Sequence, residues 1–272
     1  MREPKGSLTL PPFHVMLLRE HKCSRYIGGH CRKKYSFIVY TIPHYLLNMC
    51  YDASSSIQSY GLVSTVALLT IYFGDKYDKH FALFILAVIQ MQLAEYWMWI
   101  DQSCTSNYNK LGTYYGLFIL LFQPLVVLFG GYYWKTLNFS LKTYFILFLL
   151  MVIPGTIRAL QYIVKENKTA CSRPGKSKHL KWDFFQYPTM EMYNNMSLKY
   201  VPYIFQVIMY FLLLIIPWFF MKNRVKGPLI GMMVISSFLY HFVQYKDDWA
   251  SLWCYSTKMV FFLYLVVSFL VR

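Results

Sequence analysis

The chain has 272 residues, of which 57% are hydrophobic, 20% are aromatic and only 14% are charged. Soluble domains contain about 25% charged residues, and here the apolar residues come in long blocks, so the composition excludes an ordinary soluble protein. The net charge of +15 comes mainly from Lys and Arg before residue 35 and between the apolar blocks. Basic flanks beside apolar segments are typical of membrane proteins, and we therefore expect no nucleic-acid partner.

Residues 1–48 form a basic N-terminal extension that we expect to be poorly ordered or to lie at the membrane interface. The first 35 residues contain no long apolar run. The apolar stretch 36–47 is interrupted by Pro43, and it is too short to cross a hydrocarbon core of about 30 Å. The extension also contains His21, Cys23, His30 and Cys31. Their spacing matches no structural zinc motif, and we expect no metal site.

Seven apolar segments of 17 to 24 residues follow within residues 49–272. They are Ile57–Phe73, Phe81–Ile100, Leu111–Trp134, Leu141–Val164, Val201–Met221, Gly227–Val243 and Trp249–Val271. These lengths suit transmembrane helices, in which each backbone polar group is satisfied within the helix. The one long connection, 165–199, is basic. The sequence therefore predicts an all-α, multi-pass integral membrane protein, a bundle of seven transmembrane helices with the lipid bilayer as its partner.

Glu95 lies in the last third of the second apolar segment. At this depth an ionisable side chain is costly unless it faces protein or water. Because a helix advances about 100° per residue, Gln92, Glu95 and Trp99 share one helix face. We expect this face to be shielded from lipid and Glu95 to have a hydrogen-bond donor within reach. The candidate donors are Gln123, Arg158, His241 and Lys258.

Polar residues in the other segments complete a candidate site. They are Gln123 in the third segment, Arg158 in the fourth, Gln206 in the fifth, His241 in the sixth and Lys258 in the seventh. Because successive helices alternate in direction, the groups at 158, 206, 241 and 258 fall in the same half of the bilayer as Glu95. Together with Gln92, Trp99 and Gln123, they predict a polar cavity open to one leaflet that binds a lipid headgroup, an anion or a proton.

Three classes of function fit these residues. A membrane-embedded lipid-modifying hydrolase would use His241 or Glu95 as general base, and Ser237, Cys254 or an activated water as nucleophile. A transporter, channel or receptor would use the same groups as a proton relay or an anion site. A structural membrane component would need only the packing, with Lys258 reaching the headgroups or pairing with Glu95. The catalytic residues, the substrate and any cofactor stay open. Retinal on Lys258 is disfavoured because the third segment has no acidic counter-ion.

Several short motifs resemble a known group of membrane proteins. They are Met49-Cys50-Tyr51-Asp52-Ala53, Met91 to Trp99 with Asp101-Gln102-Ser103-Cys104, Asn107, Gln123-Pro124 and Ser251-Leu252-Trp253-Cys254. The pattern resembles uncharacterised polytopic proteins of large DNA viruses and bacteria that open with Met-Cys-Phe-Ser-Ala, and the later motifs look like the viral branch. The chain departs from the pattern at Tyr51-Asp52 and in the extension before Met49. The resemblance implies the fold, the site positions, a start at Met49 and a host or virion membrane, but no activity.

Two signals disagree about the orientation in the membrane. With seven spans, the N-terminus and the connections 101–110, 165–199 and 244–248 share one side, and their basic residues place that side in the cytoplasm. Two glycosylation sequons, at Asn167 and Asn195, favour a secretory compartment instead. So do Cys50, Cys104, Cys171 and Cys254 near the same face, if they pair. Because charge bias acts during insertion, we expect a cytoplasmic N-terminus and a cytoplasm-facing cavity.

Overall fold

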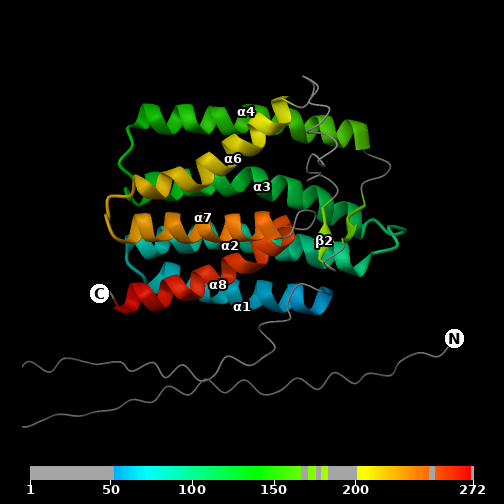
Figure 1. The fold of residues 1–272 in the computed structure, drawn as a ribbon, viewed down its shortest axis with the longest axis horizontal. Helices are drawn as coiled ribbons and strands as arrows, with labels where there is room; N and C mark the ends of the chain where they lie inside the picture. Colours follow the sequence, from blue (N-terminus) through cyan, green and yellow to red (C-terminus); the bar gives the residue numbers. More distant parts are fainter. Residues whose placement is uncertain (1–51, 167–170, 176–178, 183–200, 245–248, 271–272) are drawn as a thin grey trace, which may run out of the picture. The chain divides into compact units, whose positions relative to one another are not determined.

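A computed structural model describes residues 52–166, 171–175, 179–182, 201–244 and 249–270 (Figure 1). The chain is divided into two units, Met1–Leu46 and Leu47–Arg272. The first unit lies outside the described residues, and so do our expectations for residues 1–48. Every helix and strand below belongs to the second unit.

The seven apolar segments each fold into a helix, as predicted. The helices are α1 (Ala53–Phe73), α2 (Lys76–Ile100), α3 (Tyr108–Tyr133), α4 (Leu141–Glu166), α6 (Val201–Phe219), α7 (Lys226–Gln244) and α8 (Trp249–Leu270). The described part of the long connection also forms an antiparallel hairpin, β1 (Arg173–Pro174) and β2 (Leu180–Lys181). The fold of the described residues is therefore all-helical apart from this hairpin and one isolated bridge between Leu137 and Met221.

The helices form two layers (Figure 1). In the first layer α1, α2, α3 and α4 lie side by side in chain order, each packed against the next. The second layer runs back in the opposite order, so that α6 packs on α3 and α4, α7 packs beside α6, and α8 packs on α2. This arrangement encloses α2, which buries residues along almost its whole length, from Asp78 to Met98. The face of α2 that carries Glu95 is therefore interior.

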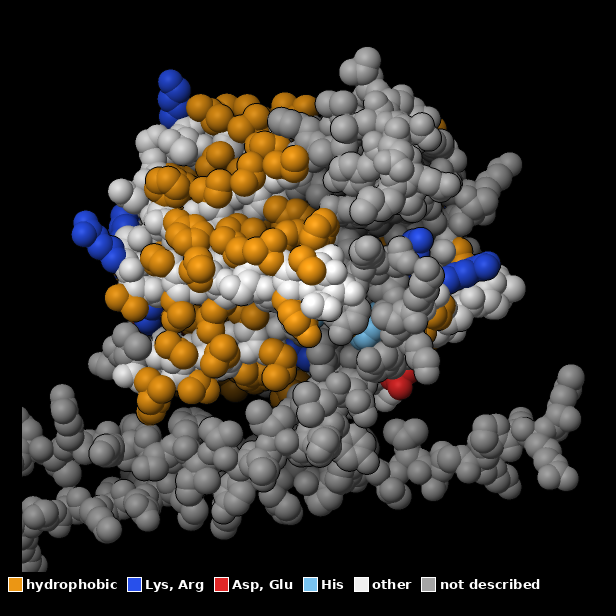
Figure 2. Space-filling model, viewed as in Figure 1, with side chains coloured by type: hydrophobic (Ala, Val, Ile, Leu, Met, Phe, Trp, Pro, Cys, Tyr) orange, Lys and Arg blue, Asp and Glu red, His pale blue; other side chains and the backbone are white. Residues whose placement is uncertain are grey.

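The outer surface of the second unit is apolar. Large hydrophobic side chains are exposed on several helices, including Leu68, Phe129, Phe145, Met232 and Leu263. On the face in view in Figure 2, hydrophobic side chains form a broad band across the helices, with most of the visible Lys and Arg atoms beyond its ends. Soluble monomers rarely expose an apolar patch of more than a few hundred Å². A band of this kind fits contact with lipid.

Five of the described helices are long and apolar enough to cross a membrane. They are α1, α2, α3, α7 and residues Ala250–Leu270 of α8. The apolar stretches described in α4 and α6 are shorter, Leu141–Ile157 and Ile208–Phe219. By length and composition the described residues thus contain five candidate membrane spans, which is compatible with a membrane protein.

Close packing of α2 against α3 generates a first prediction. A Cβ atom added at Gly112 would lie 2.6 Å from the carbonyl oxygen of Ala94 and 3.0 Å from Met98 Cγ. Gly112→Ala should therefore force the two helices apart and lower the free energy of unfolding by about 1–3 kcal/mol. Gly61→Ala is the matched control, because nothing lies within 4 Å of its added Cβ. Thermal unfolding in detergent measures both, and equal midpoints would contradict the close approach.

Candidate functional site at Glu95

Glu95 is fully buried and its carboxylate accepts three hydrogen bonds. Ser251 Oγ of α8 donates to Oε1 at 2.5 Å, and Trp182 Nε1 donates to the same oxygen at 3.1 Å. Gln92 Nε2, one turn earlier in α2, donates to Oε2 at 2.9 Å. Three donors from different parts of the chain therefore replace the water that a carboxylate would otherwise bind. The prediction that Glu95 is shielded is confirmed. In the described part of the chain its donors are not the predicted Gln123, Arg158, His241 or Lys258, and among its donors Gln92 alone is one of the predicted site residues.

Lys258 is the charged partner of this site. Its side chain is buried two turns after Ser251, on the same face of α8. The Lys258 Nζ donates to Ser59 Oγ of α1 at 3.0 Å and interacts electrostatically with Glu95. Burying two opposite charges next to each other costs less free energy than burying one of them without its partner. The pair therefore links α1, α2 and α8 in the interior of the bundle.

Trp182 reaches Glu95 from the hairpin of the long connection. Arg173 pairs with Lys181 across β1 and β2, and Gly175 N donates to His179 O at 2.7 Å. Leu180 and Trp182 are buried, and β2 packs against α8. The hairpin therefore brings an indole N–H to α2 from a position 87 residues away in the sequence.

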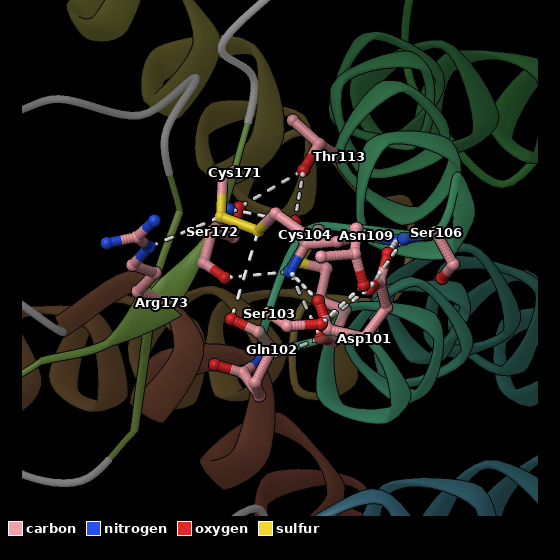
Figure 3. The surroundings of a disulfide bond; sticks show 12 residues. Asp101, Gln102, Ser103, Cys104, Ser106, Asn109, Thr113, Cys171, Ser172 and Arg173 are labelled. Atoms are coloured by element: carbon pink, nitrogen blue, oxygen red, sulfur yellow. Dashed lines mark hydrogen bonds between the residues drawn. A yellow bond between two sulfur atoms is a disulfide. The ribbon is translucent and has the colours of Figure 1, made fainter.

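A disulfide and one asparagine hold this hairpin on the α2–α3 turn (Figure 3). Cys104 in the turn is bonded to Cys171, directly before β1. Asn109 Nδ2 donates to Ser172 O at 2.9 Å, and Ser172 N donates to Asn109 Oδ1 at 2.9 Å. The same Nδ2 lies 3.1 Å from Met98 O, in the last turn of α2. The pairing of these two cysteines, which the sequence left open, thus anchors the segment that supplies Trp182.

Asp101 organises the α2–α3 turn itself. Its carboxylate accepts from Asn109 N at 3.1 Å and from Ser106 N at 3.2 Å. Burial raises the pKa of Asp101, but these hydrogen bonds outweigh it and leave the pKa below the ordinary value of 3.8. Because the N–H groups stabilise the charged form, the turn is firmest when Asp101 is ionised.

A second buried network lies at the other end of α2. Asp78 is buried, and its Oδ1 accepts from Lys226 Nζ at 2.7 Å, Tyr264 OH at 2.7 Å and Ser268 Oγ at 3.0 Å. Lys226 Nζ also contacts Asp75 Oδ2 at 2.6 Å. The network joins the start of α2, the start of α7 and the end of α8. Ion pairs and hydroxyl groups hold this end, whereas a disulfide holds the other.

The remaining predicted cavity residues fall into two groups. Gln123 is fully buried and its Oε1 accepts from Tyr210 OH of α6, while its Nε2 has no hydrogen-bond partner among the described residues. Trp99 Nε1 is likewise buried without a partner in the described part of the chain. The side chains of Arg158 and Gln206 lie outside the described residues, although α4 and α6 include both positions. The structure therefore joins Gln92, Glu95 and Lys258, and places Gln123 at a separate contact between α3 and α6.

The proposed hydrolase residues lie mainly at the α7–α8 contact. His241 Nδ1 is 2.8 Å from Ser237 O, so this nitrogen carries the proton and Nε2 is the basic nitrogen. Ser237 Oγ pairs with Ser256 Oγ at 2.7 Å. Cys254 is buried and interacts electrostatically with Tyr210. Among the described residues no group of three His, Cys, Asp or Glu is placed to hold a metal ion.

Sequence reasoning missed several residues of these networks. Ser251 was noted only as part of a short motif, and its bond to Glu95 was not predicted. Trp182 could not be identified from the sequence, because the residues around it do not indicate which helix its side chain contacts. Asp78 and Lys226 border apolar segments, where charged residues are ordinary. The sequence analysis therefore did not identify Asp78 and Lys226 as buried residues.

The comparisons with known proteins return no match. Family models, curated proteins and solved structures each give no significant similarity to this chain. The resemblance to viral and bacterial membrane proteins stays a prediction, and function has to be argued from the site.

The lowered pKa of Asp101 predicts how the turn responds to acid. A depressed carboxyl pKa contributes stability above the ordinary value of 3.8, and this stability is lost as the pH falls through the lower folded-state pKa. Hydrogen exchange of the Ser106 and Asn109 amides, corrected for intrinsic rates, should accelerate only below pH 3.8. In Asp101→Asn, exchange should already be faster at neutral pH and should show no such step. The same acid step in both proteins would contradict this role.

Proposed function

We propose that this protein is a seven-span membrane transport protein that binds a proton at Glu95. The observation that carries the proposal is a fully buried carboxylate beside a buried lysine in an apolar bundle. Ionisable groups inside membrane segments generally mark proton, ion or substrate pathways, because packing alone does not require them. The five candidate spans and the two shorter apolar helices support a count of seven.

A proton suits this site better than an anion or a lipid headgroup. Glu95 already balances the charge of Lys258, so an anion near the ammonium would also meet a carboxylate. The donors to Glu95 are neutral, a hydroxyl, an indole and an amide. Protonation of Glu95 removes its charge and frees Lys258 to attract an anion. Any anion binding at this site would accordingly follow proton uptake.

We further propose that the hairpin faces the extracytoplasmic side. The Cys104–Cys171 disulfide fits an oxidising compartment. It therefore favours the orientation indicated by the sequons and cysteines over the one indicated by the basic residues. The basic residues beyond Met49 do not favour either side. The segments on the opposite side carry eight, Lys76, Lys79, Lys135, Lys142, Lys222, Arg224, Lys226 and Arg272, and those on the hairpin side carry nine, Lys110, Lys165, Lys168, Arg173, Lys176, Lys178, Lys181, Lys199 and Lys246. Because the positive-inside rule counts Lys and Arg and not the net charge, the residues beyond Met49 do not oppose the disulfide.

A purely structural role is the second candidate, and one observation favours it. Both oxygens of Glu95 are occupied by donors, which is also the pattern of a polar clamp between helices. The hydrolase has less support, because His241 and Ser237 are engaged at the α7–α8 contact with a backbone carbonyl and Ser256. The two remaining candidates differ in whether Glu95 changes its protonation state.

Infrared difference spectroscopy tests proton binding at Glu95. Lowering the pH should produce the C=O band of a protonated carboxylic acid in the wild type, and Glu95→Gln should remove it. Glu95→Gln keeps an acceptor for Ser251 and Trp182, so it should be milder in stability than Glu95→Leu, which strands buried donors at a cost of about 3–5 kcal/mol. A spectrum without any Glu95-dependent band across the folded pH range would leave the structural role.

Glycosylation in a secretory-competent eukaryotic cell tests the orientation. We expect a glycosidase-sensitive mass shift that Asn167→Gln and Asn195→Gln together abolish. Asn138→Gln is the control, because Asn138-Phe139-Ser140 is a sequon in the α3–α4 connection, on the opposite side. Loss of the shift only in Asn138→Gln would place the hairpin in the cytoplasm.

A further inference from the structure

Two buried carboxylates stand near opposite ends of α2. Asp78 and Glu95 are 17 residues apart in one helix, which corresponds to about 25 Å at 1.5 Å per residue. The hydrocarbon core is about 30 Å thick. If α2 crosses the membrane, each carboxylate therefore lies close to a different face of it.

A single neighbouring helix supplies hydroxyl groups to both carboxylates. Near its start α8 donates Ser251 to Glu95, and near its end it donates Tyr264 and Ser268 to Asp78. α8 runs antiparallel to α2, so polar residues at the start of α8 contact the end of α2, and those at the end of α8 contact the start of α2. Packing between these helices does not by itself require a polar group at either end.

Each carboxylate also faces a lysine from a different element. Lys258 of α8 interacts with Glu95, and α1 contributes the Ser59 hydroxyl that holds its ammonium. Lys226 of α7 bridges Asp78 and Asp75. The Asp75 side chain is 43% exposed, so the network around Asp78 extends to the protein surface.

Apolar side chains fill the interval between the two networks, and those beside Asp78 are aromatic. Phe81 and Phe261 are fully buried, with ring centroids 5.9 Å apart. The ring of Tyr264 lies 4.6 Å from that of Phe81, while its hydroxyl contacts Asp78. From Ser251, which contacts Glu95, to Tyr264, α8 rises by about 20 Å, and Lys258 lies about midway. A crossing of this length needs a chain of water molecules, and the apolar lining keeps the interval dry at rest.

We propose that the α2–α8 interface is a gated proton route with Asp78 as its second relay carboxylate. The proposal rests on proton binding at Glu95 and goes beyond it by naming the path and the exit. A proton enters from the hairpin side onto Glu95 and crosses the apolar interval through transient water. The Tyr264 oxygen accepts it while the Tyr264 hydroxyl proton passes to Asp78. Release from Asp78 past Asp75 completes the transfer of one H⁺, and the electrochemical gradient of protons is the only driving force required.

Proton flux into liposomes tests the route. The purified full-length protein is reconstituted with an internal pH-sensitive dye, and a potassium diffusion potential drives protons inward. Wild-type vesicles should acidify faster than empty ones, and Asp78→Asn and Tyr264→Phe should each reduce the protein-dependent rate by about tenfold or more. Tyr144→Phe is the matched control, because Tyr144 lies on α4, away from both networks, and it should keep the wild-type rate.

The infrared band of Glu95 separates this proposal from the one on which it rests. Asp78→Asn and Tyr264→Phe should keep the Glu95-dependent band while losing flux. Wild-type flux no greater than that of empty vesicles, or full flux in both variants, would overturn the route even with the band present. Absence of the band in the wild type would overturn proton binding at Glu95 itself. Because Tyr264→Phe keeps the ring, it remains informative if Asp78→Asn fails to fold.

Discussion

The hydrogen-bonding demand of one buried carboxylate determines much of this structure. An ionised Glu95 in an apolar bundle needs donors, and α2 alone supplies only Gln92. The other donors come from α8 and from the hairpin, so both have to be positioned against α2. A hairpin with strands of two residues has little stability of its own. The disulfide to Cys104 and the two hydrogen bonds between the Asn109 side chain and the Ser172 backbone stabilise the hairpin in its place.

Polar contacts between the two layers occur at several positions along the bundle. Glu95 with Ser251 lies at one end, Asp78 with Lys226 lies at the other, and Gln123 with Tyr210 joins α3 to α6. Apolar packing between helices in lipid gains little from the hydrophobic effect, since lipid is as apolar as the helix surface. Directional contacts of this kind therefore specify which helices face each other. Aromatic residues, among them Phe81 and Trp218, pack between the helices around these polar contacts.

The helices were predictable from the sequence because lipid imposes one rule on every span: backbone groups must be satisfied internally. The same rule made Glu95 conspicuous, and spacing alone placed Gln92 beside it. The rest of the site depends on contacts across long sequence separations. Trp182 lies 87 residues from Glu95, and Ser251 lies 156 residues away. Asp78 and Lys226 were not singled out, because a charge near the end of an apolar segment is ordinary until the fold shows that neighbouring elements cover it.

The two ends of the bundle are fastened by different chemistry, and this difference bears on which end can open. Beside Glu95, the chain is closed by a covalent bond that thermal motion does not break. Beside Asp78, closure depends on Lys226, Tyr264 and Ser268, whose bonds water can replace one at a time. Asp75, already partly exposed, gives water a starting point. Displacement of the hairpin would have to strain a covalent bond, whereas separation of α7 and α8 from the start of α2 breaks only noncovalent contacts.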